Sequence, residues 1–239
     1  MIGRSGIAVK HVTRADPSSV AELAKYGVAT VHEAMGRVGL MAATMRPIYP
    51  GARVCGTAVT LFAHPGDNWM LHVAAEMLEP GDVAVLGTSS DTTDGMFGDL
   101  LATSFRARGA QGLVIDAGCR DTAELREIGF PVWSKAVHAK GTVKATVGSV
   151  NTPIICAGAL VHPGDVVLAD DDGVVVVPKA HAARTAAAAA ARETKEAGTR
   201  KRLASGELGL DIYGMREALA KAGLKYFEDE AALQRELQK

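Results

Sequence analysis

Two glycine-containing acidic segments hold the residues of this sequence that are best suited to chemistry. The first, DGMFGDLL, covers residues 94–101, and the second, GCRDTAE, covers residues 118–124. In the second segment Arg120 precedes Asp121. An arginine beside a carboxylate offers a planar fork of N–H donors that suits the carboxylate of a substrate. The two glycines of the first segment would let a ligand approach the backbone closely.

The elements around these segments predict where they lie. Each segment follows a short apolar run, residues 83–87 and 112–116, that indicates a buried strand, and each opens a helix, expected over 98–108 and 121–127. In open parallel sheets, ligands bind outside the carboxyl ends of the strands. Two helix N-termini at that edge present free backbone N–H groups and positive dipole ends. The pattern therefore predicts a site for a carboxylate or phosphate.

Structural alternatives exist for each charged residue. Asp121 could cap the helix that it opens, with Glu124 completing a capping box. Arg120 could form a surface ion pair, and Asp99 could be an ordinary acidic residue in the first turn of a helix. The glycine-rich segment does not match the dinucleotide fingerprint, and no GxxxxGK[ST] motif occurs.

The rest of the chain predicts one α/β domain. Strands alternate with helices through the first half, which implies parallel strands with right-handed crossovers. The expected helices are 17–26, a short one capped by Thr30, 68–78 and 179–197; the expected strands are 53–63, 131–133, 141–147, 154–157, 165–168 and 174–177. The tail from Lys201 is charged and helical with little core of its own, so we expect it to pack on a neighbouring subunit.

Composition excludes several classes of protein. The chain has 239 residues, of which 48% are hydrophobic, so it is expected to fold. Lys and Arg total 26 against 27 Asp and Glu, and aromatic residues are 5%, which argues against a nucleic-acid partner. The N-terminal segment lacks the apolar stretch of a secretion signal, and no apolar run is long enough to span a membrane. Three cysteines without CxxC spacing argue against a disulfide framework or a zinc cage, so we expect a cytoplasmic protein.

The two segments together resemble a known family. Gly98-Asp99, twenty intervening residues and Arg120-Asp121-x-x-Glu124 resemble the D-x20-R-D-x2-E/D signature of class II pyruvate aldolases. These are the 4-hydroxy-4-methyl-2-oxoglutarate / 4-carboxy-4-hydroxy-2-oxoadipate (HMG/CHA) aldolases, relatives of the RNase E regulator RraA. Further similar segments cover nearly the whole chain: VHEAMGRVGL (31–40), MRPIYPG (45–51), PGDNWMLHVAAE (65–76), FPVWSKA (130–136), DDDGVVVVP (170–178) and LGLDIYGMREALAKAGLKY (208–226).

The resemblance implies a fold and an assembly. The fold would be an αββα sandwich of the RraA-like, swivelling-domain type over residues 1–200, with a helical C-terminal extension over 201–239. Members of the family form trimers or dimers of trimers with sites at subunit boundaries, so a homotrimer or homohexamer is expected.

The resemblance also implies a metal site. Asp121 would bind a divalent metal, Mg²⁺ or Mn²⁺, and Glu124 would support the metal site without binding the metal directly. Asp99 would orient water on the metal. Two further glutamates, one from a neighbouring subunit, hold metal waters in the family, and by position these are Glu33 and Glu196.

The implied activity is cleavage of a small 2-oxo dicarboxylate or tricarboxylate. The backbone of Gly98, Asp99, Leu100 and Leu101 would cradle the pyruvate carboxylate, and Arg120 would stabilise the charge of the enolate. Cleavage of either substrate releases pyruvate, and oxaloacetate decarboxylation is an expected side activity because it forms the same enolate. Such enzymes serve the last steps of aromatic-compound catabolism, in the 4,5-cleavage of protocatechuate or gallate.

Other hypotheses remain to be weighed. A lysine could form a Schiff base, as in class I aldolases. Asp170-Asp171-Asp172-Gly173 could be a metal loop, although a hairpin turn is the simpler interpretation. A non-enzymatic regulator of RNase E is the alternative from a different class, although the branch to which such regulators belong lacks the aspartate found here at position 121. The candidate lysines are Lys135, Lys140 and Lys144, and the candidate histidine ligands or bases are His32, His64, His72 and His138.

Overall fold

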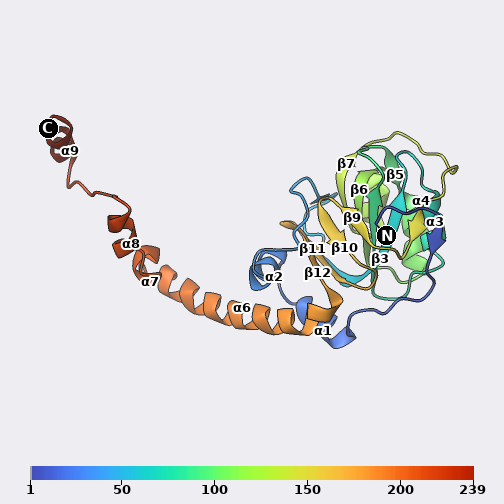
Figure 1. Ribbon diagram of the computed structural model, residues 1–239, viewed down its shortest axis with the longest axis horizontal. Helices are drawn as coiled ribbons and strands as arrows, with labels where there is room; N and C mark the ends of the chain where they lie inside the picture. Colours follow the sequence, from blue (N-terminus) through green and yellow to red (C-terminus); the bar gives the residue numbers. More distant parts are fainter. Residues whose placement is uncertain (1) are drawn as a thin grey trace. The chain divides into compact units, whose positions relative to one another are not determined.

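Four parallel strands form the centre of a ten-stranded sheet in the computed structural model, which describes residues 2–239 (Figure 1). They are β3 (Val54–Ala63), β4 (Asp82–Thr88), β6 (Gly112–Cys119) and β7 (Val132–Val137), paired in that order. Their residues are mostly apolar and buried, as expected for strands covered on both faces. Because they are parallel, their carboxyl ends lie at one edge of the sheet.

Shorter strands extend this centre. Residues 54–57 of β3 pair with β11 (Val166–Asp170), whereas Leu61 and Phe62 pair with β8 (Ser149–Val150), both antiparallel. The other strands are β1 (Ile7–Ala8), β2 (Arg46–Pro47), β5 (Gly95–Phe97), β8 (Ser149–Val150), β9 (Ile154–Cys156), β10 (Ala159–Val161), β11 (Val166–Asp170) and β12 (Gly173–Val177). Strands β9 and β10 form a separate two-stranded sheet.

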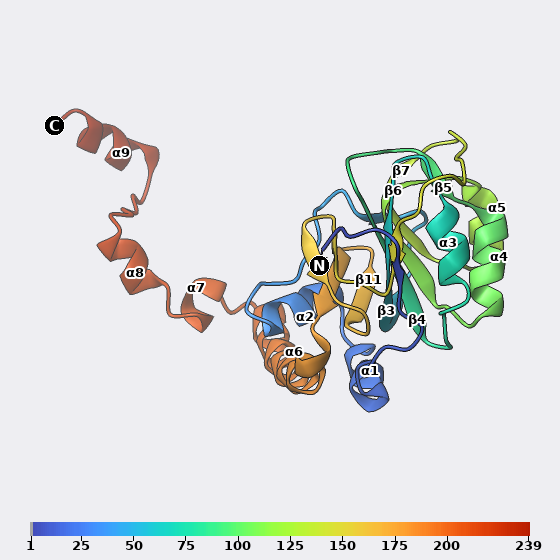
Figure 2. The same ribbon diagram turned by 45° about the vertical axis from the view of Figure 1, so that its right-hand side comes forward.

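Helices and strands cover the two faces of the sheet in different ways. Helices α3 (Trp69–Ala74), α4 (Asp99–Ala107) and α5 (Thr122–Glu127) lie together on one face (Figure 2). Beneath them the rings of Phe97 and Phe105 lie 5.4 Å apart, centroid to centroid. Each buried ring of this kind contributes about 1.5–3 kcal/mol of stability.

On the opposite face of the sheet, a layer of strands lies between the central strands and the helices. Strands β9, β10 and β12 pack there, and the β11–β12 hairpin is covered in turn by α1 (Pro17–Leu23), α2 (Val28–Ala34) and the first turns of α6 (Ala182–Ala204). The order helix, strand, strand, helix confirms the αββα sandwich expected from the sequence.

Two local expectations are wrong for physical reasons. The second helix begins after Gly27 rather than at Thr30, because the Oδ2 of the distant Asp170 accepts a hydrogen bond from Val28 N at 2.8 Å. Residues 141–147 do not form a strand, because their backbone bonds to the loop after β3 and not to a strand: Val143 forms a bridge with Asp67, and the amides of Ala145 and Thr146 donate to the Asp67 carboxylate.

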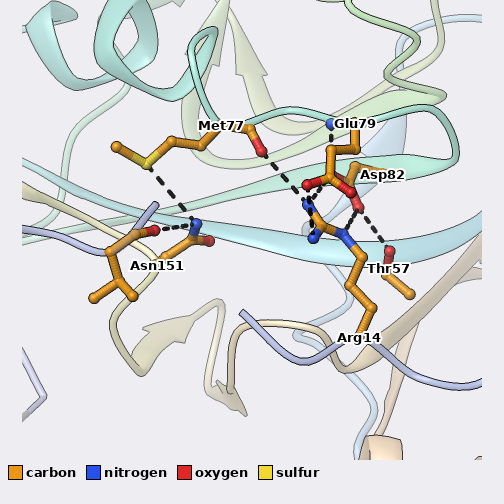
Figure 3. Close-up of polar contacts among 7 residues, drawn as sticks. Arg14, Thr57, Met77, Glu79, Asp82 and Asn151 are labelled. Atoms are coloured by element: carbon orange, nitrogen blue, oxygen red, sulfur yellow. Dashed lines mark hydrogen bonds and ion pairs between the residues drawn. The ribbon is translucent and has the colours of Figure 1, made fainter. Parts of the chain in front are cut away.

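An ion pair attaches the N-terminal segment to the amino end of the central strands (Figure 3). Arg14 donates from Nε and Nη2 to the two carboxylate oxygens of the buried Asp82, at 2.9 and 2.7 Å. Thr57 Oγ1 and Glu79 N also donate to that carboxylate. Asp82 therefore has partners for both oxygens, and Arg14 supplies the positive charge that offsets its own.

The C-terminal part is helical. A 3₁₀ turn at Lys179–His181 leads into α6, which is followed by α7 (Gly209–Ile212), α8 (Arg216–Lys221) and α9 (Glu230–Leu237). By its contacts the chain divides into two units, with the boundary between Arg192 and Glu193. In Glu193–Lys239, all of which the structure describes, no residue is buried. Among residues 2–239, no helix is long and apolar enough to cross a membrane.

Candidate functional site

The loops that follow the parallel strands surround a cavity of about 110 Å³. It lies at the carboxyl edge of the sheet, where the sequence predicts the site. Six predicted site residues line it, namely Gly98, Asp99, Leu100, Leu101, Arg120 and Asp121, together with Asn68, His72, Gly95, Met96, Phe97 and Lys144.

The Asp121 carboxylate does not cap the helix that follows it. Its backbone is left-handed, with φ 56° and ψ 42°, and its side chain makes no capping hydrogen bond to α5. Instead, Asp121 Oδ2 accepts a hydrogen bond from Asp99 N at 3.2 Å and lies 3.5 Å from Arg120 Nε. The capping-box alternative is therefore wrong. The ion pair considered as an alternative role for Arg120 does form, but its partner, Asp121, lines the same cavity.

Gly98 is required by the closeness of the two loops. Its φ of −155° is open to any residue, so the backbone conformation does not demand glycine. A Cβ at this position, however, would lie 2.2 Å from Asp121 Oδ2 and 3.2 Å from Arg120 Cγ. The missing side chain is what lets the start of α4 meet the Asp121 carboxylate.

The N-terminus of α4 offers donors to an anion. The first amides of a helix have no acceptor within the helix. Gly98 occupies the N-cap position and supplies no capping side chain. The amide of Asp99 is used by Asp121, which leaves those of Leu100 and Leu101 for a ligand. Leu100 is 80% exposed, so its side chain does not belong to the hydrophobic core.

Three further polar residues line the cavity: Asn68, which was not predicted, and His72 and Lys144, which were considered only as a possible ligand or base and as a possible Schiff-base lysine. Asn68 is 8% exposed, and its Oδ1 is buried with no hydrogen-bond partner among the described residues. Partial burial and the nearby Lys144 ammonium lower the pKa of His72, which favours its neutral form. Lys144 brings a positive charge to the cavity from the loop after β7.

A signal for Asn68 was present in the sequence. Pro65-Gly66-Asp67 directly follows the strand 53–63, so Asn68 belongs to a third loop at the carboxyl edge. The same reasoning that selected residues 94–101 and 118–124 would have included it. Lys144 was considered only as a possible Schiff-base lysine, because it was expected to lie inside a strand over 141–147 and not in a loop at this edge.

The three glutamates expected at the site do not line the cavity. Glu124 is exposed on α5. Glu33 lies on α2, across the sheet, where it pairs with Arg37 at 2.9 Å and with Arg192 at 3.6 Å. Glu196 belongs to the second unit. Roles for Glu33 and Glu196 at a site shared between subunits remain predictions.

The competing hypotheses fare differently. Lys135 pairs with Asp91 at 2.5 Å and with Asp116 at 3.0 Å; burial alone would lower its pKa, but these carboxylates raise it, so it stays protonated and is a poor Schiff-base nucleophile. Lys140 pairs with Asp94 at 2.8 Å. Residues 170–173 form the tight turn of the β11–β12 hairpin, which confirms the simpler interpretation.

A larger cavity lies elsewhere in the first unit and is a weaker candidate for catalysis. It has a volume of about 700 Å³ and a mostly apolar lining between α2 and the start of α6. The one carboxylate in its lining, Asp165, accepts hydrogen bonds from the backbone amides of His162 and Lys179. Its acidic oxygens are therefore already used.

The residues of the smaller cavity fit a weakly held, hydrated cation. Among the described residues no group of three or more His, Cys, Asp or Glu side chains could enclose a metal. Asp121 supplies one carboxylate, and Asn68 Oδ1 is a buried oxygen without a partner. Mg²⁺ is often bound by one or two carboxylates and keeps several waters, so this oxygen set suits Mg²⁺ or Mn²⁺ and does not suit zinc.

Comparisons with known proteins agree with the fold. Residues 28–176 match the model of the RraA-like family, described as Aldolase/RraA. A Halalkalibacterium halodurans protein, provisionally named a 4-hydroxy-4-methyl-2-oxoglutarate aldolase, is 25% identical over 77% of this chain and 87% of its own length. A Burkholderia multivorans protein with the same provisional name is 32% identical over 60% of this chain and 87% of its own. The crystal structure of Streptomyces coelicolor RraAS2, titled an unusual member of the RNase ES inhibitor RraA family, covers 80% of this chain and 99% of its own, with a TM-score of 0.70 and 29% identity.

Proposed function

Because the chain belongs to the RraA-like family, we propose that it is a divalent-metal-dependent pyruvate aldolase. Its substrates would be 4-hydroxy-4-methyl-2-oxoglutarate, cleaved to two pyruvates, or 4-carboxy-4-hydroxy-2-oxoadipate, cleaved to pyruvate and oxaloacetate. The observation that carries the proposal concerns the carboxylate of Asp121. It does not cap α5, and it shares one cavity with Arg120 and the N-terminus of α4.

The cleavage needs groups that receive a negative charge. The C4 hydroxyl loses its proton to water and becomes a carbonyl as the C3–C4 bond breaks, and the electron pair of that bond forms the enolate of pyruvate; protonation at C3 then yields pyruvate. The amides of Leu100 and Leu101 would hold the carboxylate next to the 2-oxo group. Arg120 would place fixed positive charge beside the enolate oxygen.

The cation has a defined part in this scheme. A bound Mg²⁺ or Mn²⁺ supplies Lewis-acid polarisation of the 2-oxo acid. Asp121 would hold the cation, and the buried Asn68 Oδ1 offers a second oxygen, directly or through water. Asp99 donates its backbone amide to Asp121 Oδ2, so it restricts the direction in which that carboxylate points.

The part of the substrate beyond C3 would also lie near a positively charged side chain. Both candidate substrates carry at least one carboxylate beyond C3. Lys144 and the neutral form of His72 line the cavity and offer donors to such a group. Oxaloacetate also has a distal carboxylate and loses CO₂ to give the same enolate, so its decarboxylation is part of the proposal.

Pyruvate release measured with lactate dehydrogenase tests the function. Wild-type protein is treated with EDTA, and each substrate is assayed with and without added Mg²⁺. We expect turnover that is lost on chelation and restored by Mg²⁺, and no recovery in Asp121→Asn. Full activity in the EDTA-treated protein would contradict the metal-dependent mechanism. Inactivation by borohydride in the presence of substrate would instead indicate a Schiff base.

A second candidate follows from the similarity to RraAS2. RraAS2 is described as a member of a family of RNase ES inhibitors, which favours a regulator that binds a ribonuclease without catalysis. A pull-down with RNase E, run beside the pyruvate assay, separates the two. Ribonuclease binding without pyruvate release from either substrate would favour the regulator.

A further inference from the structure

The loop after β7, residues 138–147, borders the cavity through Lys144 and is held at two points. We call it the strap. It carries little regular structure and most of its residues are exposed, so its own packing does not fix it. Lys144, which lines the cavity, lies within it.

The first attachment is at Lys140. Its Nζ lies 2.8 Å from Asp94 Oδ1, and its carbonyl accepts a hydrogen bond from Gly95 N at 3.0 Å. A Cβ on Gly95 would lie 2.1 Å from the carbonyl oxygen of His138. The start of the strap therefore lies directly against β5.

The second attachment depends on one buried carboxylate. Asp67 is 2% exposed, and its Oδ2 accepts hydrogen bonds from the amides of Ala145 and Thr146 at 2.7 and 2.6 Å. Its Oδ1 accepts from Trp69 N at 2.9 Å. Burial alone would raise the pKa of Asp67, but these three amides lower it, so the group stays ionised at neutral pH.

Two residues that line the cavity adjoin the groups bound by Asp67: Asn68 follows it in sequence, and Lys144 precedes Ala145 in the strap. Asn68, with its unpaired Oδ1, directly follows Asp67 and donates its backbone N–H to the Val143 carbonyl at 3.1 Å. Lys144 lies between Val143 and Ala145, both of which are bonded to residues 66–68. The side chain of Lys144 is exposed and has no ion-pair partner within 4.0 Å among the described residues, so the backbone alone fixes its place.

We propose that Asp67 is a positioning residue that fixes the strap so that Lys144 faces the cavity and recognises the part of the substrate beyond C3. The proposal rests on the proposed function for the identity of that substrate. Asp67 does not touch the reacting atoms. It determines which substrates are bound rather than how the enolate is stabilised.

The test compares wild type with Asp67→Asn, which keeps the shape but replaces one acceptor oxygen by an N–H₂ donor. We expect hydrogen exchange of the Ala145 and Thr146 amides to accelerate at least tenfold. We also expect KM for 4-hydroxy-4-methyl-2-oxoglutarate to rise about tenfold or more, with kcat within threefold. Exchange of the methyl protons of pyruvate with deuterium, which needs the enolate but no distal carboxylate, should stay within threefold. Asp91→Asn, at an exposed carboxylate of the β4–β5 loop, is the matched control and should change none of these.

A double-mutant cycle shows whether Asp67 acts through Lys144. Lys144→Ala should raise KM to a similar extent without accelerating exchange, and the double variant should be no worse than either single one. Additive effects on KM, or unchanged exchange in Asp67→Asn, would overturn the proposal. So would an equal loss of cleavage and of pyruvate exchange. If Asp67→Asn does not fold, Ala145→Pro removes one of the amide donors with Asp67 intact and should give the same rise in KM.

Failure of the proposed function gives a different result. Wild-type protein would then show neither cleavage nor pyruvate exchange, whereas faster amide exchange in Asp67→Asn would still show that Asp67 holds the strap.

Discussion

At the scale of single residues, Arg120 carries the clearest kinetic prediction. Its guanidinium lies in the cavity beside Asp121, where the enolate charge would develop. Removing a donor aimed at a developing oxyanion costs about 2.7–4 kcal/mol. Arg120→Ala should therefore lower kcat for pyruvate release by roughly 10²–10³-fold, with the thermal midpoint nearly unchanged because the side chain is 41% exposed. A kcat like that of wild type would contradict the role assigned to Arg120.

Gly98 tests the geometry of the carboxylate. Gly98→Ala places a Cβ 2.2 Å from Asp121 Oδ2, so the carboxylate must move while the extended backbone stays favourable. We expect a loss of at least tenfold in Mg²⁺-dependent activity with an unchanged circular dichroism spectrum. The matched control is Gly198→Ala, on α6, where a Cβ meets nothing within 4 Å and removal of a helical glycine stabilises by about 1 kcal/mol. Equal activity in the two variants would show that the close approach at Gly98 is unimportant.

At the scale of elements, local patterns predicted the central strands and most helices, but not the distant contacts that fix where elements begin and how the loops between them lie. The strand 53–63 and the helix opening at Pro17 were predictable, because apolar alternation and an aspartate cap are local features. The start of α2 depends on Asp170, far away in sequence, and no local pattern shows it. For the same reason, the two segments of the site were predictable, whereas the strap was not: residues 141–147 were expected to form a strand, and Lys144 was considered only as a possible Schiff-base lysine.

The buried pair of Arg14 and Asp82 predicts how firmly the N-terminal segment is attached. Arg14→Ala leaves Asp82 charged and buried without its cation, although Thr57 and Glu79 still donate to it. Breaking such a pair typically costs 3–5 kcal/mol, and the remaining donors place this case near about 3 kcal/mol. Urea unfolding measures the loss. Lys25→Ala removes the exposed pair with Glu22 and should barely move the midpoint.

The strap should respond to acid in a defined direction. The pKa of Asp67 is lower in the folded protein than the usual value of about 3.9. Its contribution to stability is therefore fully present above about pH 4 and is lost as pH falls through the lower folded value. Unfolding free energies of wild type and Asp67→Asn should differ at pH 7 and converge below about pH 4. A difference that stays constant down to pH 2 would contradict this assignment of charge.

At the scale of the whole molecule, the second unit predicts association. Nothing in Glu193–Lys239 is buried, yet it exposes large apolar side chains: Leu203, Leu208, Tyr213, Met215, Leu224, Tyr226, Phe227, Leu233 and Leu237. Surface of this kind is usually covered by another chain. Light scattering should give the mass of a homotrimer or homohexamer, and Phe227→Asp with Leu233→Asp should reduce it. Lys221→Ala, on exposed α8, is the control; a monomeric wild type would refute the expectation.

The left-handed backbone of Asp121 narrows the evolutionary choices at that position. Aspartate, asparagine and glycine tolerate such a conformation, whereas most other residues are penalised there. In the genetic code, asparagine and glycine are each one nucleotide away from aspartate. A single nucleotide change can thus remove the anionic oxygen of this side chain while the fold is retained. The same fold can then serve functions that do not require cleavage of a covalent bond.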